Sequence, residues 1–217
     1  MADHLILADA FAYADGALTG NGSWIVRRGG LFGALNVASG VAAGNSTGGL
    51  SNTLNAASIA ECYADLDITF TAVGVNNTQA VVYLRDNDAP TAALWESIYV
   101  VFVANPTTGN SVQIVKRIGG TATVIAAHAY NAAGRPVWEA NVAKRIRFSC
   151  VGLTASVSWD GGTPLVGTLS AGEIRSGKFA LYGVQALTGY PKFDNLTFGT
   201  FCFPDYFRRH VTRRAIA

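Results

Sequence analysis

The chain has few charged residues and little sulfur. Of its 217 residues, 14% are charged and 50% are hydrophobic, and it contains three cysteines and one methionine. The cysteines, Cys62, Cys150 and Cys202, lie far apart and show neither the CxxC spacing nor the Cys/His spacing of a zinc site. We therefore expect free and mostly buried thiols in a protein that folds in a reducing cytoplasm.

Long apolar runs are also missing. No segment approaches the ~20 apolar residues that a membrane-spanning helix needs. The first residues, MADHLILADAFAYADG, have neither the basic start nor the continuous apolar run of a signal peptide. The formal net charge of +2 is too small to attract a nucleic acid by itself. We expect neither a membrane nor a nucleic acid as a direct partner.

Several common motifs of catalysis and nucleotide binding are absent. The chain contains no P-loop, no GxGxxG and no HExxH. Its three histidines, His4, His128 and His210, are far apart in the sequence. We therefore expect the protein not to be an enzyme.

What the sequence does contain is residues typical of strands and turns. It has 24 glycines and 11% aromatic residues, and aromatic and β-branched residues favour strands. Residues 62–70 read CYADLDITF, in which polar residues alternate with the apolar residues Ala64, Leu66, Ile68 and Phe70. A period of two indicates a strand with one buried face.

Similar patterns predict further strands, and only residues 91–98 and 134–143 indicate a helical turn or an irregular loop. We expect these strands within residues 78–88, 97–120 (two strands around a turn at 105–110), 121–130, 143–152, 154–167 and 176–200. Short turns without a βαβ rhythm indicate an all-β, antiparallel two-sheet sandwich. We expect one such domain over residues 1–203, with a short irregular N-terminal arm. We place four aromatic residues in its core or the end layer of that core, namely Phe70, Phe148, Trp159 and Phe193.

Four longer segments follow one another in a recognisable order. They read DAFAYADGALTGNGSW, YVVFVANPTTGNSVQIVKRIGGTATVIA, RIRFSCVGLTASVSWDGGTPL and SGKFALYGVQALTGYPKFDNLTFG. The first is similar to a D-x-F…D-G-x-L…W start, and the last to a G-x-x-G-L…F-D-N-x-x-V end. Their order and spacing resemble a concanavalin A-like jelly roll of the laminin-G or pentraxin type, and the resemblance covers roughly residues 9–200.

The resemblance implies that the first and last strands lie near one another, which would bring Asp9 close to Asp194. Related jelly rolls often hold calcium with oxygens from these ends, so the two aspartates are calcium candidates. Two acids supply fewer oxygens than the six to eight that calcium takes. The alternative is that Asp194 caps backbone N–H groups at the end of a strand. We expect no other cofactor.

Jelly rolls of this shape include glycoside hydrolases, which need two carboxylates across one sheet. The resemblance implies E-x-D-x-x-E or E-x-D-x-E on one strand, and none of the four glutamates shows this spacing. Asp65 and Asp67, with Glu61 at the start of the strand, are the nearest arrangement. We interpret Asp65 and Asp67 as solvated side chains that are not catalytic.

The scaffold also serves carbohydrate binding, in which exposed aromatic side chains stack on sugar rings. Two tryptophans lie among polar residues in irregular segments, Trp95 in PTAALWES and Trp138 in GRPVWEAN. Either residue can form a rim that contacts a ligand or partner, or can pack locally. The alternation around Trp159 favours core packing for that residue.

Residues 204–217 form a basic arm after the sandwich. Residues 1–207 hold 12 basic and 14 acidic side chains, whereas the last ten residues hold four arginines and no acid. We expect the aromatic residues of the arm to dock by burial and its arginines to pair with carboxylates of a neighbour. The predicted docking residues are Tyr206, Phe207, Arg208, Arg209, Arg213 and Arg214.

Fold and composition together suggest a context by analogy alone. Such jelly rolls recur in bacteriophage virions as capsid decoration proteins and as tail or fibre adhesion modules. The leading hypothesis is a non-enzymatic virion surface subunit, made in the host cytoplasm, that binds the major capsid or tail protein and copies of itself. The alternative is a carbohydrate-binding, lectin-like module with a glycan partner. A glycoside hydrolase is the third hypothesis.

Overall fold

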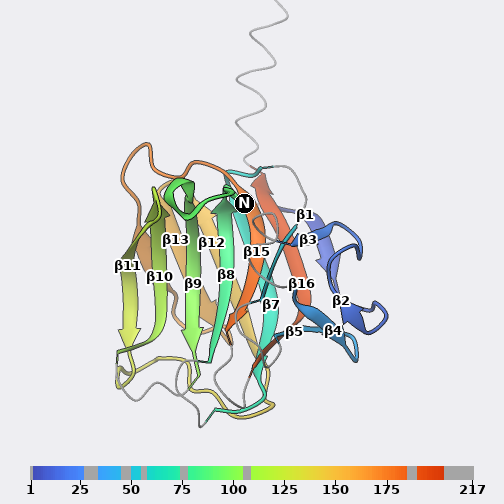
Figure 1. The fold of residues 1–217 in the computed structure, drawn as a ribbon. Helices are drawn as coiled ribbons and strands as arrows, with labels where there is room; N and C mark the ends of the chain where they lie inside the picture. Colours follow the sequence, from blue (N-terminus) through green and yellow to red (C-terminus); the bar gives the residue numbers. More distant parts are fainter. Residues whose placement is uncertain are drawn as a thin grey trace, which may run out of the picture.

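The computed structural model describes residues 2–26, 34–44, 50–54, 58–73, 78–104, 109–184 and 190–202. In this part of the chain the structure is almost entirely β, with one short 3-10 turn, η2 (Ala92–Leu94). The strands form two antiparallel sheets (Figure 1). The predicted two-sheet antiparallel sandwich is confirmed. None of the described segments forms a helix with the length and hydropathy needed to cross a membrane.

The larger sheet has nine strands in the described part of the chain. In spatial order, eight of them are β14 (Leu165–Thr168), β13 (Thr154–Trp159), β12 (Lys144–Val151), β7 (Cys62–Phe70), β16 (Pro191–Cys202), β5 (Val41–Ala43), β4 (Asn36–Ala38) and β2 (Gly16–Ala17). The ninth strand, β1 (Ala2–Asp9), pairs with β16. Strand β16 is long enough to pair with β5 at its start and with β1 further along.

The smaller sheet has seven strands in the same residues. In spatial order they are β11 (Thr121–Ala129), β10 (Asn110–Ile118), β9 (Ser97–Val103), β8 (Gln79–Asp86), β15 (Lys178–Val184), β6 (Leu50–Leu54) and β3 (Trp24–Val26). Every strand predicted between residues 62 and 200 is present. Of the strands before residue 58, β2 to β5 were not predicted because segments of two or three residues show no measurable alternation.

The core lies between the two sheets and is built from alternate residues of each strand. The apolar residues of β7 are buried as the alternation predicted, and their polar neighbours point to the other face. All four aromatic residues that were predicted for the core belong to one buried cluster, namely Phe70, Phe148, Trp159 and Phe193. Trp24, which is 1% exposed, packs in the same cluster against Phe11 and Phe179.

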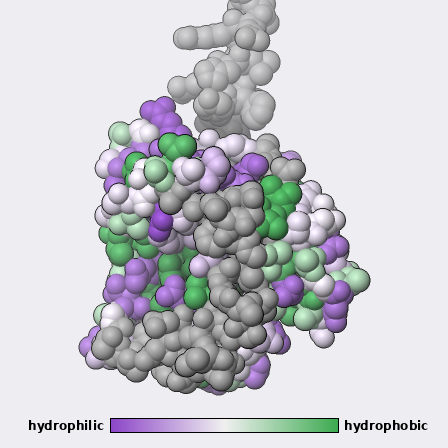
Figure 2. Space-filling model, viewed as in Figure 1, coloured by the Kyte–Doolittle hydropathy of each residue, from purple (hydrophilic) through white to green (hydrophobic). Residues whose placement is uncertain are grey.

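The N-terminus differs from the irregular arm that the sequence suggested. Residues 2–9 form β1, which pairs antiparallel with β16, so that Asp9 lies opposite Leu196. The physical reason is that β16 continues past β5 and would otherwise leave backbone N–H and C=O groups unpaired at its edge. The expected proximity of the first and last strands is confirmed. On the face shown in Figure 2, hydrophobic and hydrophilic residues are interspersed over the coloured surface.

The burial of Phe148 gives a direct test of the strand phase. Phe148→Ala removes a fully buried ring from the centre of β12, and such a truncation lowers the free energy of unfolding by ~3–5 kcal/mol. Chemical denaturation measures this loss. Val166→Ala, at a position that is 54% exposed on β14, is the matched control and should change stability little. Equal effects of the two substitutions would show that the strand phase is wrong.

Candidate functional site

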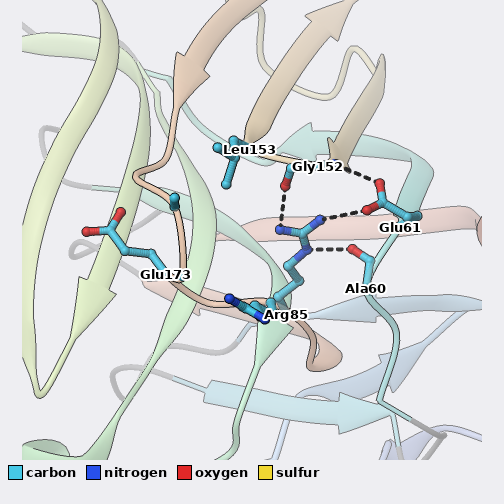
Figure 3. Close-up of a pocket in the computed structure, with 9 residues that line it drawn as sticks. Ala60, Glu61, Arg85, Gly152, Leu153 and Glu173 are labelled. Atoms are coloured by element: carbon cyan, nitrogen blue, oxygen red, sulfur yellow. Dashed lines mark hydrogen bonds and ion pairs between the residues drawn. The ribbon is translucent and has the colours of Figure 1, made fainter.

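A pocket of about 360 Å³ opens at one end of the sandwich, between the two sheets. It is bounded by the start of β7, the end of β8, the turn between β12 and β13, and the loop between β14 and β15. Its lining residues are Ala60, Glu61, Arg85, Gly152, Leu153, Ala171, Gly172, Glu173 and Arg175 (Figure 3). The pocket therefore combines charged side chains with glycine backbone and one aliphatic side chain.

Arg85 lines the pocket because β8 bulges near its end. The pairing of β8 with β15 shifts in register between the Tyr83 and Asp86 positions. Arg85 itself has a positive φ of 51°, a conformation that non-glycine residues seldom adopt. A bulge of this kind redirects a side chain. Here it leaves the Arg85 side chain only 2% exposed, between the sheets.

The guanidinium of Arg85 joins three separate segments of the chain. Its Nε donates to the carbonyl oxygen of Ala60 at 2.5 Å, and its Nη1 donates to the carbonyl oxygens of Gly152 at 3.0 Å and Ile174 at 3.2 Å. Its Nη2 lies 3.8 Å from Oε1 of Glu61 (Figure 3). Burying a cation requires such compensation, because a charge without partners is costly away from water.

Gly177 allows the backbone to pass directly over Arg85. A Cβ atom at Gly177 would lie 2.0 Å from the carbonyl carbon of Arg85 and 2.4 Å from the nitrogen of Asp86. No side chain fits at such distances, so this position requires glycine. Gly177 also forms an isolated two-way backbone bridge with Ile59, which fixes the loop after β14 against the segment before β7.

Glu61 forms the opposite wall from Glu173. Oε2 of Glu61 accepts a hydrogen bond of 2.7 Å from the backbone nitrogen of Gly152, and the Glu61 side chain keeps 29% of its surface exposed. This carboxylate is thus fixed by the turn and by Arg85, but it still faces solvent. Leu153, next in the turn, is 42% exposed and adds an apolar surface at the mouth of the pocket.

Glu173 is held by Lys116 of β10. The ammonium Nζ of Lys116 lies 2.7 and 2.9 Å from the two carboxylate oxygens, and the backbone nitrogen of Ser170 donates to Oε2. The hydrogen bond from Lys116, followed by that from Ser170, lowers the pKa of Glu173. In Figure 3 its carboxylate points away from Arg85. Glu173 is therefore an ionised wall residue.

Two thiols lie next to the Arg85 site. Cys62 and Cys150 are directly opposite each other on β7 and β12, and both are buried. Burial raises the pKa of the Cys150 thiol to about 11, and burial together with the neighbouring Cys150 raises that of Cys62 further. The expectation of free, buried thiols holds for these two residues.

The two tryptophans proposed as a rim are both only 6% exposed. Trp138 packs edge-on against Phe70 and Phe102 in the main core. Trp95 lies in a separate cluster on the outer face of the smaller sheet, stacked on Tyr99, with the guanidinium carbon of Arg117 3.9 Å from its ring centre. Neither ring is presented as an open stacking platform, and the structure favours local packing for both.

Asp9 and Asp194 have different surroundings. The Asp9 carboxylate accepts hydrogen bonds from the backbone nitrogen of Phe11 at 2.7 Å, the Tyr13 hydroxyl at 2.9 Å and Nε1 of Trp24 at 2.7 Å. Burial and the hydrogen bond to Asp9 raise the pKa of Tyr13 to about 12. Asp194 accepts from the backbone nitrogen of the next residue. Both carboxylates are thus hydrogen-bond acceptors, and the calcium hypothesis stays a prediction.

Asp65 and Asp67 lie on the outer face of β7, as predicted, but they are paired rather than freely solvated. Arg147 and Arg145 of the adjacent β12 approach them at 3.2 and 3.3 Å. The amide of Asn195 also donates to Asp67 at 2.7 Å. The pairing follows from register, because each arginine lies directly opposite its aspartate.

The predicted docking residues of the arm, Tyr206 to Arg214, lie outside the described residues. The sequence reasoning missed the residues that build the pocket, above all Arg85, Glu173 and Arg175. The one available signal was the single arginine that directly follows the run AVVYL. Nothing in the sequence indicates that the segments around residues 60, 152 and 174 converge on it.

The role of Arg85 can be tested through stability. Arg85→Met keeps the volume but removes every donor, so the carbonyl oxygens of three segments lose their partner. We expect the free energy of unfolding to fall by ~3–5 kcal/mol, as when one partner of a buried ion pair is removed. Urea denaturation measures it. Arg175→Met, at an exposed position of the same pocket, should shift stability by ~0.5 kcal/mol or less; comparable losses would contradict the role of Arg85.

The raised thiol pKa values predict slow chemical modification. In a Cys202→Ser background, native protein at pH 8 should react with a thiol reagent at least roughly a hundredfold more slowly than protein unfolded in urea. The unfolded thiols ionise above about pH 9, whereas the folded Cys150 stays protonated to about pH 11. Stability should therefore decline as pH rises from about 9 to 11. Native labelling as fast as unfolded labelling would refute the burial of the pair.

Comparison with solved structures identifies the fold. The carbohydrate-binding module CBM66 from Bacillus subtilis matches with a TM-score of 0.61 and 16% identity, over 82% of this chain and 96% of that one. The carbohydrate recognition domain of Emp46p matches with a TM-score of 0.61 and 10% identity, over 88% and 94%. A β-glucanase of Bacillus licheniformis matches with a TM-score of 0.54 and 12% identity, over 90% and 98%.

At these low sequence identities the structural matches show a shared fold and nothing further. No family model matches the chain, and no curated protein matches it either. The structural neighbours include both a carbohydrate-binding module and glucanases, one of them of family GH16. The two-sheet architecture, the strand pairing and these neighbours together show that the chain has the concanavalin A-like jelly-roll fold that its sequence resembles.

Proposed function

We propose that the protein is a non-catalytic, lectin-like carbohydrate-binding module that holds a saccharide in the pocket beside Arg85. The observation that carries the proposal is the pocket itself. It sets a partly exposed carboxylate, Glu61, beside the apolar surface of Leu153 and the backbone of two glycines. Its volume of about 360 Å³ lies within the usual range for small-ligand sites.

The chemistry of the lining suits a sugar. A pyranose presents hydroxyl groups around its ring edge and C–H groups on its faces. Glu61 can accept hydrogen bonds from hydroxyls, and its position is fixed beforehand by Gly152 and Arg85. Leu153 offers a surface for a C–H face. Because the Glu61 carboxylate is already fixed in the free protein, less conformational entropy is lost when a ligand binds.

The pairing of the acids supports binding rather than hydrolysis. A glycosidase needs one carboxyl whose pKa is raised, so that it can protonate the leaving oxygen. The pKa of Glu173 is lowered, and its carboxylate points away from Arg85. Asp65 and Asp67 form ion pairs with arginines. Glu173 therefore does not supply the protonated carboxyl that hydrolysis requires.

One segment matches the sequence pattern of serine hydrolases. Residues 44–48 read GNSTG and fit GxSxG. That motif requires a strand before the serine and a helix after it. Here β5 precedes the serine, and the next described element is the strand β6 rather than a helix. Residues 45–48 themselves lie outside the described residues.

The virion hypothesis has less support than this alternative. It depends on residues 204–217, which lie outside the described residues, and the structural matches to CBM66, Emp46p and the β-glucanase give it no support. A role on a virion surface, with capsid or tail proteins as partners, therefore stays a prediction. The two functions are compatible, since an adhesion module can bind a glycan.

Binding can be tested with a glycan array, followed by calorimetry on each saccharide that binds. Ala171→Trp places an indole at the exposed edge of the pocket and should abolish measurable binding by filling the space. Thr163→Trp is the matched control. Thr163 lies in the exposed loop after β13, whereas Leu153 of the pocket comes directly before that strand, so the two positions are at opposite ends of β13.

Two results would refute the proposal. The first is that no saccharide on the array binds the wild-type protein. The second is that Ala171→Trp binds as tightly as Thr163→Trp, which would place the site elsewhere. A reducing-sugar assay on every bound polysaccharide completes the test, because release of reducing ends by the wild-type protein would contradict the absence of catalysis.

A further inference from the structure

One cation in the pocket differs from all the other charged groups of its lining. Arg175 follows Ile174 in the loop between β14 and β15, and its side chain is exposed. Its Nη2 lies 4.0 Å from the position that a Cβ would take on Gly172, so the guanidinium sits beside the pocket wall. Among the described residues it forms no hydrogen bond and no ion pair.

The other charges of the pocket are already matched. Arg85 faces three carbonyl oxygens and lies 3.8 Å from Glu61. Glu173 is paired with Lys116 at 2.7 Å. The lining and Lys116 together hold three cations and two anions, so the excess positive charge belongs to Arg175.

We propose that the pocket selects saccharides that carry an anionic substituent, a carboxylate or a sulfate, and that Arg175 binds this group. The inference rests on the proposed function and adds the chemical class of the ligand. A guanidinium presents two parallel N–H donors that match the two oxygens of a carboxylate or sulfate. Arg175 has these donors available, whereas those of Arg85 are occupied by the protein.

Glu61 and Arg175 offer opposite charges to a ligand in the pocket. Glu61 accepts hydrogen bonds from hydroxyl groups and repels an anion placed against it. Arg175 attracts an anion. A ligand with hydroxyls on one side and a single negative group on the other satisfies both, whereas a simple inorganic anion or a neutral sugar satisfies only one. The pocket is therefore suited to an acidic sugar unit.

The test compares each acidic saccharide with its own neutral form. Calorimetry at low ionic strength is run with galacturonate, glucuronate and mannuronate oligosaccharides, their methyl esters, and sulfated galactan oligosaccharides with their desulfated forms. Removing a hydrogen bond to a charged group should cost about tenfold to a hundredfold in affinity. We expect at least one acid form to bind tighter than its neutral form by this factor, and the difference to shrink with added salt.

Variants assign the difference to Arg175. Arg175→Gln should bring the affinity for the acid form down to that for its neutral form, while leaving the neutral form unchanged. Arg175→Lys keeps the charge but loses the paired donors, so its affinity should lie between the two. Arg135→Gln is the matched control. Arg135 belongs to the connection between β11 and β12, in which the backbone nitrogen of Asn141 donates to Phe70 at the end of β7 that is far from the pocket. This substitution should change the affinity for neither the acid nor the neutral form.

The outcomes separate the two proposals. Neutral and acid forms that bind equally would overturn the anionic preference and leave carbohydrate binding intact. A preference that persists in Arg175→Gln would overturn the assignment to Arg175. Binding of no saccharide, acid or neutral, would overturn both proposals. Carboxylated and sulfated probes, run as separate arms, show which anionic group is bound.

Discussion

Arg85 carries its guanidinium into the space between the sheets, where it donates to carbonyl oxygens of Ala60, Gly152 and Ile174. These residues are far apart in the sequence, and each belongs to a connection rather than to a strand. Connections of this kind have few backbone partners of their own. One buried cation therefore supplies the hydrogen bonds that hold three loops at the same end of the sandwich.

The bulge in β8 and the glycine at position 177 are both consequences of that contact. A regular strand would carry the Arg85 side chain to one face of the sheet, away from the loops that it holds. The bulge redirects it, and only glycine leaves room for the segment that crosses over it. The pocket is the space that remains once these segments are fixed, so its walls are set by backbone contacts and do not depend on a ligand.

The strands between residues 62 and 200 could be predicted because they are long and one of their faces is buried. The alternation in CYADLDITF and KRIRFSCV reports the sheet phase directly, and the buried faces follow from it. The pocket could not be predicted in this way. It depends on a local break in alternation at Arg85 and on which loops meet there, and both are consequences of the tertiary fold. Strands β1 and β5 were missed for a related reason, since both pair with the edge of β16, which lies far away in the sequence.

The distribution of paired and unpaired charges is the physical basis on which we propose recognition rather than catalysis. General acid–base chemistry needs a carboxyl whose environment disfavours its ionised form. Here Lys116 holds the pKa of Glu173 below its usual range, so this carboxylate does not supply a proton near neutral pH. Asp65 and Asp67 each lie against an arginine, and these contacts fix their acceptor oxygens. The donors of Arg175 are not used by the described residues, and in our proposal a bound anion accepts from them.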